Sequence, residues 1–535
     1  MKIIYTLKKH AILLITITIL LAGTAAYINS LPNKFLWDDN QAIVTNLHIR
    51  DWKYFPNFFT ESISTGSGFP SNYWRPMILS VYTTEWHLWE YWEPGYHMVN
   101  IFFHLASAVL VFFFLYFLFR KRIPAAIAAL FFVVHPLQTE AVTFISGLAD
   151  PLSLFFMLAG LIFLLRARKV IPSKSSVLLN YFFVFLTFIL ALLTKERSVV
   201  FPAVFLLVDI FIWKTRETST ISLKQFLKLS SLRVLPFICG SALYLFLRAT
   251  ILNLQNTFNI YGVVTEYTAH FSVRLFTFLK ISPSYFSLLF WPAHLQMERS
   301  NAIIPATSFF EPLVLMGTII IILLVMVIVN TWKKAPEYSF GVLWFLVLLF
   351  PSSGILVPVA GIIYEHYLYA PLIGLAFIFG LAWYSFYKKA NLSWRYFLLT
   401  LLVILLALSI RQSARRNLEW RDEITFYTNT LQYSPKSLQM NNNLGLAYIN
   451  KGDFPAAEKV YLTAIKFNPF SPEPHHNLGN LYYRTGRLNE AIQEYQAALK
   501  ILPNSMSYRA LYQLYLDKGE PQKAEMIRQD SIIKQ

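Results

Sequence analysis

Long runs of hydrophobic residues recur along the first three quarters of the chain, separated by short polar and basic segments. The stretches 311–330 and 396–410 are two examples. About 20 apolar residues are needed to cross a bilayer core as a helix. Because backbone groups in lipid must hydrogen-bond within the protein, such runs form α-helices. The pattern therefore predicts an all-α integral membrane protein.

Eleven of these runs are interpreted as membrane spans. They cover residues 11–28, 99–119, 123–140, 148–165, 177–194, 198–213, 232–248, 311–331, 338–351, 367–386 and 395–411. The segment 271–294 is also apolar, but it contains two basic residues and two prolines. Counting it as a span would place Lys333 and Lys334 outside, so we predict a re-entrant or interfacial helix on the outer side.

Basic residues gather in the polar segments on one side of these spans. The clusters are Lys8/Lys9, Arg120–Arg122, Arg166/Arg168/Lys169, Lys214/Arg216 with Lys224/Lys228, Lys333/Lys334 and Lys388/Lys389. The positive-inside rule makes that side cytoplasmic and accounts for the net charge of +17 without a nucleic-acid partner. The first run resembles a signal peptide, but we favour an uncleaved span, and an odd span count places the C-terminal tail outside the cytoplasm.

The tail repeats with a period of 34 residues. Leu444-Gly445-x-x-Tyr448 recurs as Leu478-Gly479-x-x-Tyr482. Further equivalent positions are Gly452 and Gly486, Ala457 and Ala491, Tyr461 and Tyr495, Ala464 and Ala498, and Pro469 and Pro503. This is the period of the tetratricopeptide (TPR) repeat, a pair of packed helices that binds peptides or protein partners. We predict a membrane domain over 1–411, with an outer loop over 29–98, and a TPR domain over 412–535.

Two acidic residues, Asp38 and Asp39, follow the first span at the start of the long outer loop. Paired carboxylates at a membrane surface suit a general base or a metal ligand. The competing interpretation is that they cap a helix that starts near Asn40. Further along the loop, Arg75 stands among aromatic residues and is either a phosphate clamp or a snorkelling member of an aromatic belt.

Further polar residues fall at the predicted outer ends of other spans. His97, Asn100 and His104 share one helical face, where packing by satisfied polar groups is favoured over metal ligation. The remaining candidates are His135, Glu140, Asp150, Lys195, Glu196, Arg197, Glu365 and His366. The inner loops offer mainly Lys and Arg, so this distribution indicates an active site at the outer leaflet.

Taken together, these motifs resemble the transmembrane and TPR-containing O-mannosyltransferase family of the GT-C glycosyltransferase superfamily. The motifs are Phe35-x-Trp37-Asp38-Asp39-x-x-Ala42-Ile43-x-x-Asn46, Arg75-Pro76, His97-x-x-Asn100-x-x-x-His104, His135-Pro136-x-x-Thr139-Glu140-Ala141-Val142, Gly147-x-Ala149-Asp150, Lys195-Glu196 and the TPR tail. The resemblance covers residues 30–505.

The resemblance implies a GT-C-type membrane-helix bundle that transfers a sugar from a polyprenyl-phosphate donor to Ser or Thr hydroxyls of proteins, with inversion. It matches Asp38 or Asp39 to the first-loop acid, and we prefer Asp39 as the base and Asp38 as its support or a metal contact. It also implies that Arg75, Lys195 and His366 contact the donor phosphate. No cofactor is certain, and a divalent metal stays open.

The sequence departs from the family pattern at Leu148 and His366, where arginine is usual, and its TPR array is short. The short chain with few accessory parts favours a bacterial inner membrane with the TPR domain outside the cytoplasm. The alternative is the endoplasmic reticulum membrane with lumenal TPRs. The rival function is a non-catalytic scaffold that displays TPRs for envelope assembly. A transporter is disfavoured because the ionisable residues lie at span ends and no inverted repeat is found.

Overall fold

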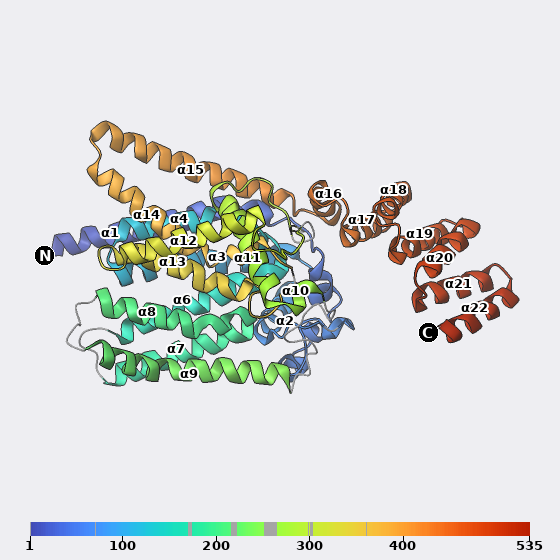
Figure 1. The fold of residues 1–535 in the computed structure, drawn as a ribbon, viewed down its shortest axis with the longest axis horizontal. Coiled ribbons are helices and arrows are strands. Elements are labelled where there is room, and N and C mark those ends of the chain that lie inside the picture. The colour runs from blue at the N-terminus through green and yellow to red at the C-terminus, as the bar shows by residue number, and fades with distance from the viewer. Residues whose placement is uncertain are drawn as a thin grey trace. The chain divides into compact units, whose positions relative to one another are not determined.

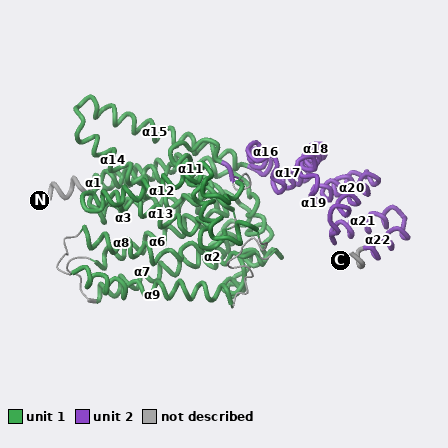
Figure 2. Tube along the Cα trace, in the orientation of Figure 1, with its two compact units in different colours: residues 1–295, 303–421 green, residues 296–302, 422–535 purple. Residues whose placement is uncertain are grey.

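The computed structural model describes residues 2–69, 71–168, 174–215, 222–250, 265–297, 299, 303–359 and 361–534. Within these ranges every regular element is helical, which confirms the all-α prediction. The chain divides into two compact units (Figure 2). Unit 1 contains residues 1–295 and 303–421, and unit 2 contains residues 296–302 and 422–535.

Unit 1 contains eight described helices that are long and apolar enough to cross a membrane, as expected of a multi-pass membrane protein. These spans correspond to α1 (Lys2–Tyr27), α3 (Glu93–Phe119), α6 (Ala149–Ala167), α7 (Lys174–Thr194), α8 (Phe201–Thr215), α9 (Leu223–Ala249), α12 (Pro312–Thr331) and α15 (Leu392–Leu418). Each coincides with one of the eleven predicted spans. Figure 1 shows them running side by side as a bundle.

The other three predicted spans are shorter or broken. The span predicted over 123–140 consists of α4 (Arg122–Val134) and α5 (Thr139–Thr143), and the chain bends by 52° between them. The bend falls at His135-Pro136, because proline lacks an N–H and restricts the residue before it. The remaining two are α13 (Pro336–Leu349) and α14 (Leu372–Lys389).

The predicted re-entrant or interfacial segment, 271–294, contains α11 (Phe271–Phe290), with Pro283 inside the helix. It is not among the eight described helices that meet the length and apolarity of a span. It packs closely on α12, where a Cβ added at Gly317 would lie 1.9 Å from the carbonyl oxygen of Leu279. Lys280 adds an ion pair of 2.8 Å with Glu311. A re-entrant or interfacial helix remains our interpretation.

A buried acid joins three spans near the predicted cytoplasmic ends. Asp209 in α8 is fully buried and pairs with Arg168 at 3.0 Å and Arg233 at 3.4 Å. Ser230 donates a further hydrogen bond of 2.8 Å. The ion pairs therefore tie α6, α8 and α9 together. Lys169 and Arg216, which belong to the predicted inner basic clusters, lie outside the described residues.

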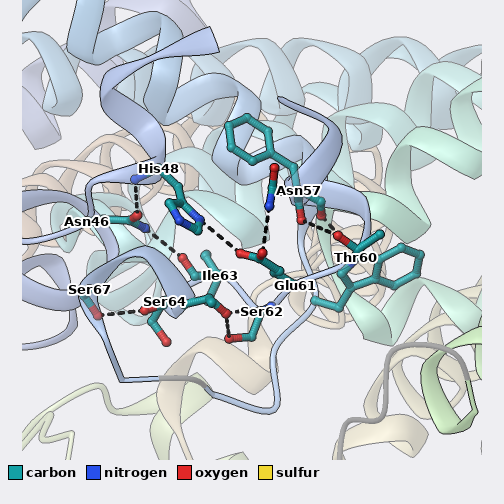
Figure 3. A network of polar contacts seen from close by, with 12 residues as sticks. Asn46, His48, Asn57, Thr60, Glu61, Ser62, Ile63, Ser64 and Ser67 are labelled. Carbon is teal, nitrogen blue, oxygen red and sulfur yellow. Dashed lines mark hydrogen bonds and ion pairs between the residues drawn. The ribbon is translucent and has the colours of Figure 1, made fainter. Parts of the chain in front are cut away.

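The long loop between α1 and α3 is folded into short helices and α2 (Pro76–Trp89). A polar network holds its middle section together (Figure 3). Glu61 contacts His48 Nδ1 at 3.0 Å and accepts from Asn57 Nδ2 at 2.8 Å, while Asn46 Nδ2 donates to the carbonyl of Ile63 at 3.0 Å. Side-chain contacts within the loop thus hold its middle section in a defined conformation.

Unit 2 is a stack of helix pairs, as the 34-residue period predicts. The helices are α16 (Glu423–Tyr433), α17 (Leu438–Lys451), α18 (Phe454–Phe467), α19 (Pro472–Arg484), α20 (Leu488–Ile501), α21 (Ser505–Asp517) and α22 (Pro521–Lys534). Gly445 and Gly479 admit the rings of Tyr461 and Tyr495, since an added Cβ would approach them to 2.4 and 2.7 Å. Helix α15 continues past the predicted boundary at residue 411 to Leu418.

Candidate active site

Loops that are far apart in the sequence meet at one end of the unit 1 bundle. Four contacts show this: Asp39 with Ser146, Arg75 with Glu196, Asp150 with Lys195, and Glu140 with His366. Their partners are separated by 45 to 226 residues, as the residue numbers show. The structure therefore brings together most of the candidate residues from the outer loops.

The Asp39 carboxylate is buried and held on both oxygens. Oδ1 accepts from the backbone N–H of Ser146 at 2.8 Å and from its hydroxyl at 2.5 Å, and Oδ2 accepts from the N–H of Leu36 at 2.9 Å. Burial raises the pKa of Asp39 to about 7, although these hydrogen bonds oppose the shift. Asp39 precedes a single π-helical turn, Asn40–Val44, but makes no capping hydrogen bond to it, so the helix-cap alternative is wrong for this residue.

Asp38 differs from its neighbour because its side chain is exposed to solvent. Surrounding protein raises the pKa of its carboxyl, and the positive charge of Arg75 opposes that shift. The preceding residue, Trp37, has a φ of 46°, a left-handed backbone conformation that is uncommon for a bulky side chain. Backbone strain of this kind concentrates where a side chain is held in a working position.

Arg75 forms a two-pronged ion pair with Glu196. Its Nη2 and Nε lie 2.8 and 3.1 Å from the two carboxylate oxygens, and its guanidinium stacks 4.6 Å from the ring centroid of Tyr73. Burial opposes the charge of Arg75, but Glu196 outweighs it and raises the pKa. The planar fork predicted to clamp a phosphate therefore holds a carboxylate in this structure.

Lys195 and Asp150 form a second ion pair, with Nζ 2.5 Å from Oδ1. Lys195 is only 5% exposed. Burial lowers the pKa of Lys195 to about 8, against the attraction of Asp150 and with a further lowering from Arg197 and Arg75.

Glu140 and His366 form a dyad at the break between α4 and the following helices. Glu140 accepts from the backbone N–H of His366 at 3.0 Å, and its other oxygen lies 2.6 Å from His366 Nδ1. Arg197 Nη2 lies 3.3 Å from His366 Nε2. Since arginine can only donate, Nε2 is the acceptor and the ring proton sits on Nδ1, facing Glu140.

A pocket of about 50 Å³ opens among these groups. Asp150, Lys195, Arg197 and His366 supply its ionisable lining, and its apolar lining includes Leu154, Met157, Val200 and Leu348 from the spans and their ends. Arg197 packs over the ring of Tyr367 at 4.0 Å. Among the described residues it has no carboxylate within ion-pair distance, so it carries the least compensated charge in the pocket.

The histidines and the asparagine predicted on one face of the second span support the backbone instead. His97 Nε2 contacts the carbonyl of Asn33 at 3.2 Å, and Asn100 Nδ2 donates to the carbonyl of Phe144 at 2.9 Å. His104 bridges Tyr369 and the carbonyl of Val133. These contacts satisfy carbonyls where helices break, which agrees with the packing interpretation.

His135 plays a similar part, since Nδ1 accepts from the N–H of Leu137 at 3.2 Å and Nε2 lies 3.1 Å from the carbonyl of Leu289. Glu365 is buried beside Arg416, 3.7 Å away, and Arg416 also pairs with Glu419. In the described part of the chain, no group of three or more His, Cys, Asp or Glu side chains is arranged to hold a metal ion.

Two arginines near the site were not selected from the sequence. Arg416 follows the last predicted span, and Arg248 ends the predicted span 232–248. Arg248 is 4% exposed and donates 2.6 Å to the carbonyl of Asn72 in the first loop. The position of Arg248, a charged residue at the outer end of an apolar run, could have marked it in the sequence. Its contact with Asn72, however, depends on the tertiary structure.

The family models matched in unit 2 describe a TPR repeat over residues 445–486 and a tetratricopeptide repeat over residues 472–505. Most of the chain is similar to protein O-mannosyl-transferase TMTC3 of Homo sapiens, with 26% identity over 82% of this chain and 50% of that protein. Tmtc1 of Drosophila melanogaster is 28% identical over 82% and 60%, and F38B6.6 of Caenorhabditis elegans is 26% identical over 85% and 62%. The chain thus spans about half to two thirds of the length of these relatives.

Crystal structures of ArnT from Cupriavidus metallidurans align with most of the chain. The undecaprenyl-phosphate-bound form gives a TM-score of 0.42 at 12% identity over 90% of this chain and 79% of that one, and the apo form gives 0.43 at 14% over 91% and 80%. These TM-scores are too low for the alignment to bear on chemistry. Over most of its length the chain is therefore similar to transmembrane, TPR-containing proteins named protein O-mannosyl-transferases, and its C-terminal unit matches the TPR family models.

Proposed function

We propose that this protein is an inverting membrane glycosyltransferase. It transfers a hexose, with mannose as the first candidate, from a polyprenyl-phosphate donor to a hydroxyl acceptor, with Ser or Thr of proteins as the expected class. The relatives carry the name protein O-mannosyl-transferase, which supports the reaction class. The chemistry is expected at the outer face of a bacterial inner membrane, with a lumenal endoplasmic reticulum face as the alternative.

The observation that carries the proposal is that both charged and apolar side chains line the pocket. Lys195 and Arg197 line it with cationic groups that bind a phosphate, and His366 lies beside them. Leu154, Met157, Val200 and Leu348 line it with surface suited to the first isoprene units. A lipid phosphate has this polarity, with a compact anion attached to an apolar chain. The pocket is small, so only the phosphate and its nearest atoms are assigned to it.

Asp38 is the better candidate for the base. The sequence favoured Asp39, but the Asp39 carboxylate is 1% exposed and both of its oxygens accept hydrogen bonds. Asp38 is exposed and lies within the electrostatic influence of Arg75. In the proposed step its carboxylate takes the acceptor hydroxyl proton, the acceptor oxygen bonds to the anomeric carbon, and the bond from that carbon to the phosphate oxygen breaks.

Arg75 and Lys195 are each paired with an acid in this structure, Arg75 with Glu196 and Lys195 with Asp150. Donor binding is therefore proposed to be an exchange in which phosphate oxygens replace part of these carboxylate contacts. The two acids keep the cations compensated while no donor is bound, which avoids the cost of leaving a buried cation unpaired. The TPR unit is proposed to bind the protein acceptor or a partner.

The test is direct transfer by the purified chain in nanodiscs. The reaction contains undecaprenyl-phosphate-mannose, then the corresponding glucose donor, and a peptide rich in Ser and Thr, with mass spectrometry of the product. A hexose on the peptide that is lost in Asp38→Asn supports the proposal. Absence of transfer with each donor, together with no loss of hexose from envelope proteins when the gene is deleted, would favour the TPR scaffold instead.

A further inference from the structure

The Glu140–His366 dyad has a geometry that phosphate binding alone does not require. Glu140 contacts His366 twice, at the backbone N–H and at Nδ1, so the ring is fixed in position and in tautomer. The ring stacks on Tyr364, with centroids 5.3 Å apart and planes 17° apart. Its other nitrogen, Nε2, belongs to a residue that lines the pocket and accepts from Arg197. A carboxylate behind an imidazole is an arrangement that favours proton transfer at the far nitrogen.

We propose that the Glu140–His366 dyad takes up a proton when the lipid phosphate binds and delivers it to the phosphate as the sugar leaves. The inference rests on the proposed function and deepens it. Arg197 turns from His366 Nε2 to a phosphate oxygen, which frees Nε2 for a proton. His366, held by Glu140, then becomes an imidazolium that donates to the phosphate.

The proposed step balances in protons and charge. The donor is a phosphodiester with one negative charge. When the bond between the anomeric carbon and the phosphate oxygen breaks, the electron pair stays on that oxygen and the lipid phosphate gains a second charge. The imidazolium gives it the Nε2 proton and becomes neutral, while Asp38 holds the proton from the acceptor. The products are the glycoside and a lipid phosphate monoanion.

Charges around His366 explain why protonation waits for the donor. Lys195, Arg197 and Arg75 disfavour the imidazolium, while Glu140 and Asp150 favour it. In the donor-free protein burial and the three cations prevail, and the pKa of His366 lies well below its ordinary value. A bound phosphodiester adds a negative charge beside Arg197 and Lys195, and that charge raises the pKa of His366 and so favours its protonation.

The experiment measures binding rather than turnover. The full chain in nanodiscs is titrated by calorimetry with a polyprenyl methyl phosphodiester, which has no sugar to transfer and keeps one charge from pH 5 to 9. Measurements at several pH values, in two buffers of different ionisation enthalpy, report protons taken up. We expect uptake of about one proton, with a loss of affinity of about tenfold per pH unit, while the pH lies between the pKa values of His366 in the free and in the ligand-bound protein.

His366→Asn retains a donor towards Glu140 but cannot be protonated, so its binding should lose the proton uptake and the pH dependence that the parent shows below pH 7, where Lys195 remains charged. The matched control is His475→Asn in unit 2, where His475 Nδ1 lies 2.6 Å from Glu494, because that variant removes an equivalent Glu–His pair outside the pocket. It should behave as the parent protein does.

Three negative results have different meanings. Binding that is weakened by Arg197→Gln but shows no proton uptake in the parent would overturn the dyad and leave the phosphate pocket in place. Binding that Arg197→Gln does not weaken, or no binding, would remove the pocket and with it the proposed function. Uptake that persists in His366→Asn would assign the proton to another group and also overturn the dyad.

Discussion

Ser146 donates both its backbone N–H and its hydroxyl to the same oxygen of Asp39, at 2.8 and 2.5 Å. The two residues are 107 positions apart. The contact fastens the start of the first loop to the short helix before α6, and so it fixes where Asp38 stands. Asp39 is therefore a positioning residue in our account, with an effect on stability that depends on pH.

The first prediction concerns that pH dependence. Burial raises the pKa of Asp39 to about 7, above its value in an unfolded chain. Between about pH 4 and 7 the folded protein therefore binds more protons at this site, and its contribution to stability falls as pH rises, by at most about 1.4 kcal/mol per pH unit. Asn cannot titrate, so Asp39→Asn should lose this component.

The measurement is the thermal unfolding midpoint of the parent and of Asp39→Asn in nanodiscs at pH 5, 6, 7 and 8. The midpoint of the parent should drop relative to the variant over this range. Ser146→Ala is the companion variant, since it removes the hydroxyl donor and keeps the carboxyl. Equal pH slopes in the parent and in Asp39→Asn would contradict a buried titrating carboxyl at this position.

The second prediction separates the two neighbouring acids by rate. Asp38→Asn removes an exposed carboxylate without disturbing a buried contact, so folding should be preserved. A positioned base contributes about 10² to 10⁴-fold, and transfer should fall by that factor with little change in the donor KM. The rate of product formation in a single turnover, measured over pH 5 to 9, checks the predicted fall in transfer. A parental rate in Asp38→Asn would return the base to Asp39 or to another group.

Much of the fold was accessible from the sequence because its signals are local. The 34-residue spacing of Gly445 and Gly479 identified the TPR pairs, and uninterrupted apolar runs located eight spans. The broken span at His135-Pro136 was read as continuous, since apolar composition does not report a bend of 52°. Composition also could not tell which of two adjacent acids, Asp38 or Asp39, is buried.

Pairing within the site was beyond sequence reasoning for a physical reason. Glu196 and Lys195 are neighbours in the chain, but they pair with Arg75 and Asp150 rather than with each other. Partner choice depends on which loops meet after the spans have packed. Arg197 follows them directly in the chain, but the sequence does not show that it has no carboxylate within ion-pair distance among the described residues.

The third prediction tests the exchange at Arg75. If phosphate replaces Glu196 on the guanidinium, Glu196→Gln should strengthen donor binding, because a neutral amide competes less well for the fork. Arg75→Lys should weaken donor binding by about 10- to 100-fold, since lysine cannot reproduce two parallel hydrogen bonds. Calorimetry with the phosphodiester probe gives both affinities, and thermal midpoints serve as the folding control. Affinities that are unchanged in both variants would assign the pair to structure alone.

The fourth prediction concerns sidedness. Charge bias places the N-terminus in the cytoplasm and the tail after Ile410 outside. A periplasm-active phosphatase fused after Gln535 should therefore be active in a bacterial host, and a fluorescent protein that matures only in the cytoplasm should stay dark at the same position. An inactive phosphatase and a bright fluorescent protein would mean that α11 crosses the membrane or that one of the short helices α13 and α14 does not.

The last prediction concerns the TPR unit. Unit 1 has its own buried core, and the division from unit 2 falls between Arg421 and Asp422, so a chain that ends at Arg421 should still insert and bind the phosphodiester probe. Removing residues 422–535 should lower transfer to a folded protein acceptor much more than transfer to a short Ser/Thr peptide. The reason is that a TPR array can bind parts of a folded protein acceptor other than the reacting hydroxyl, and a short peptide lacks those parts. A chain that ends at Asp517 and lacks only α22 is the matched control and should lose less. Equal losses for protein and peptide in the Arg421 truncation would show that unit 2 supports the membrane domain rather than acceptor recognition, and full transfer to both would assign the TPRs to a different partner.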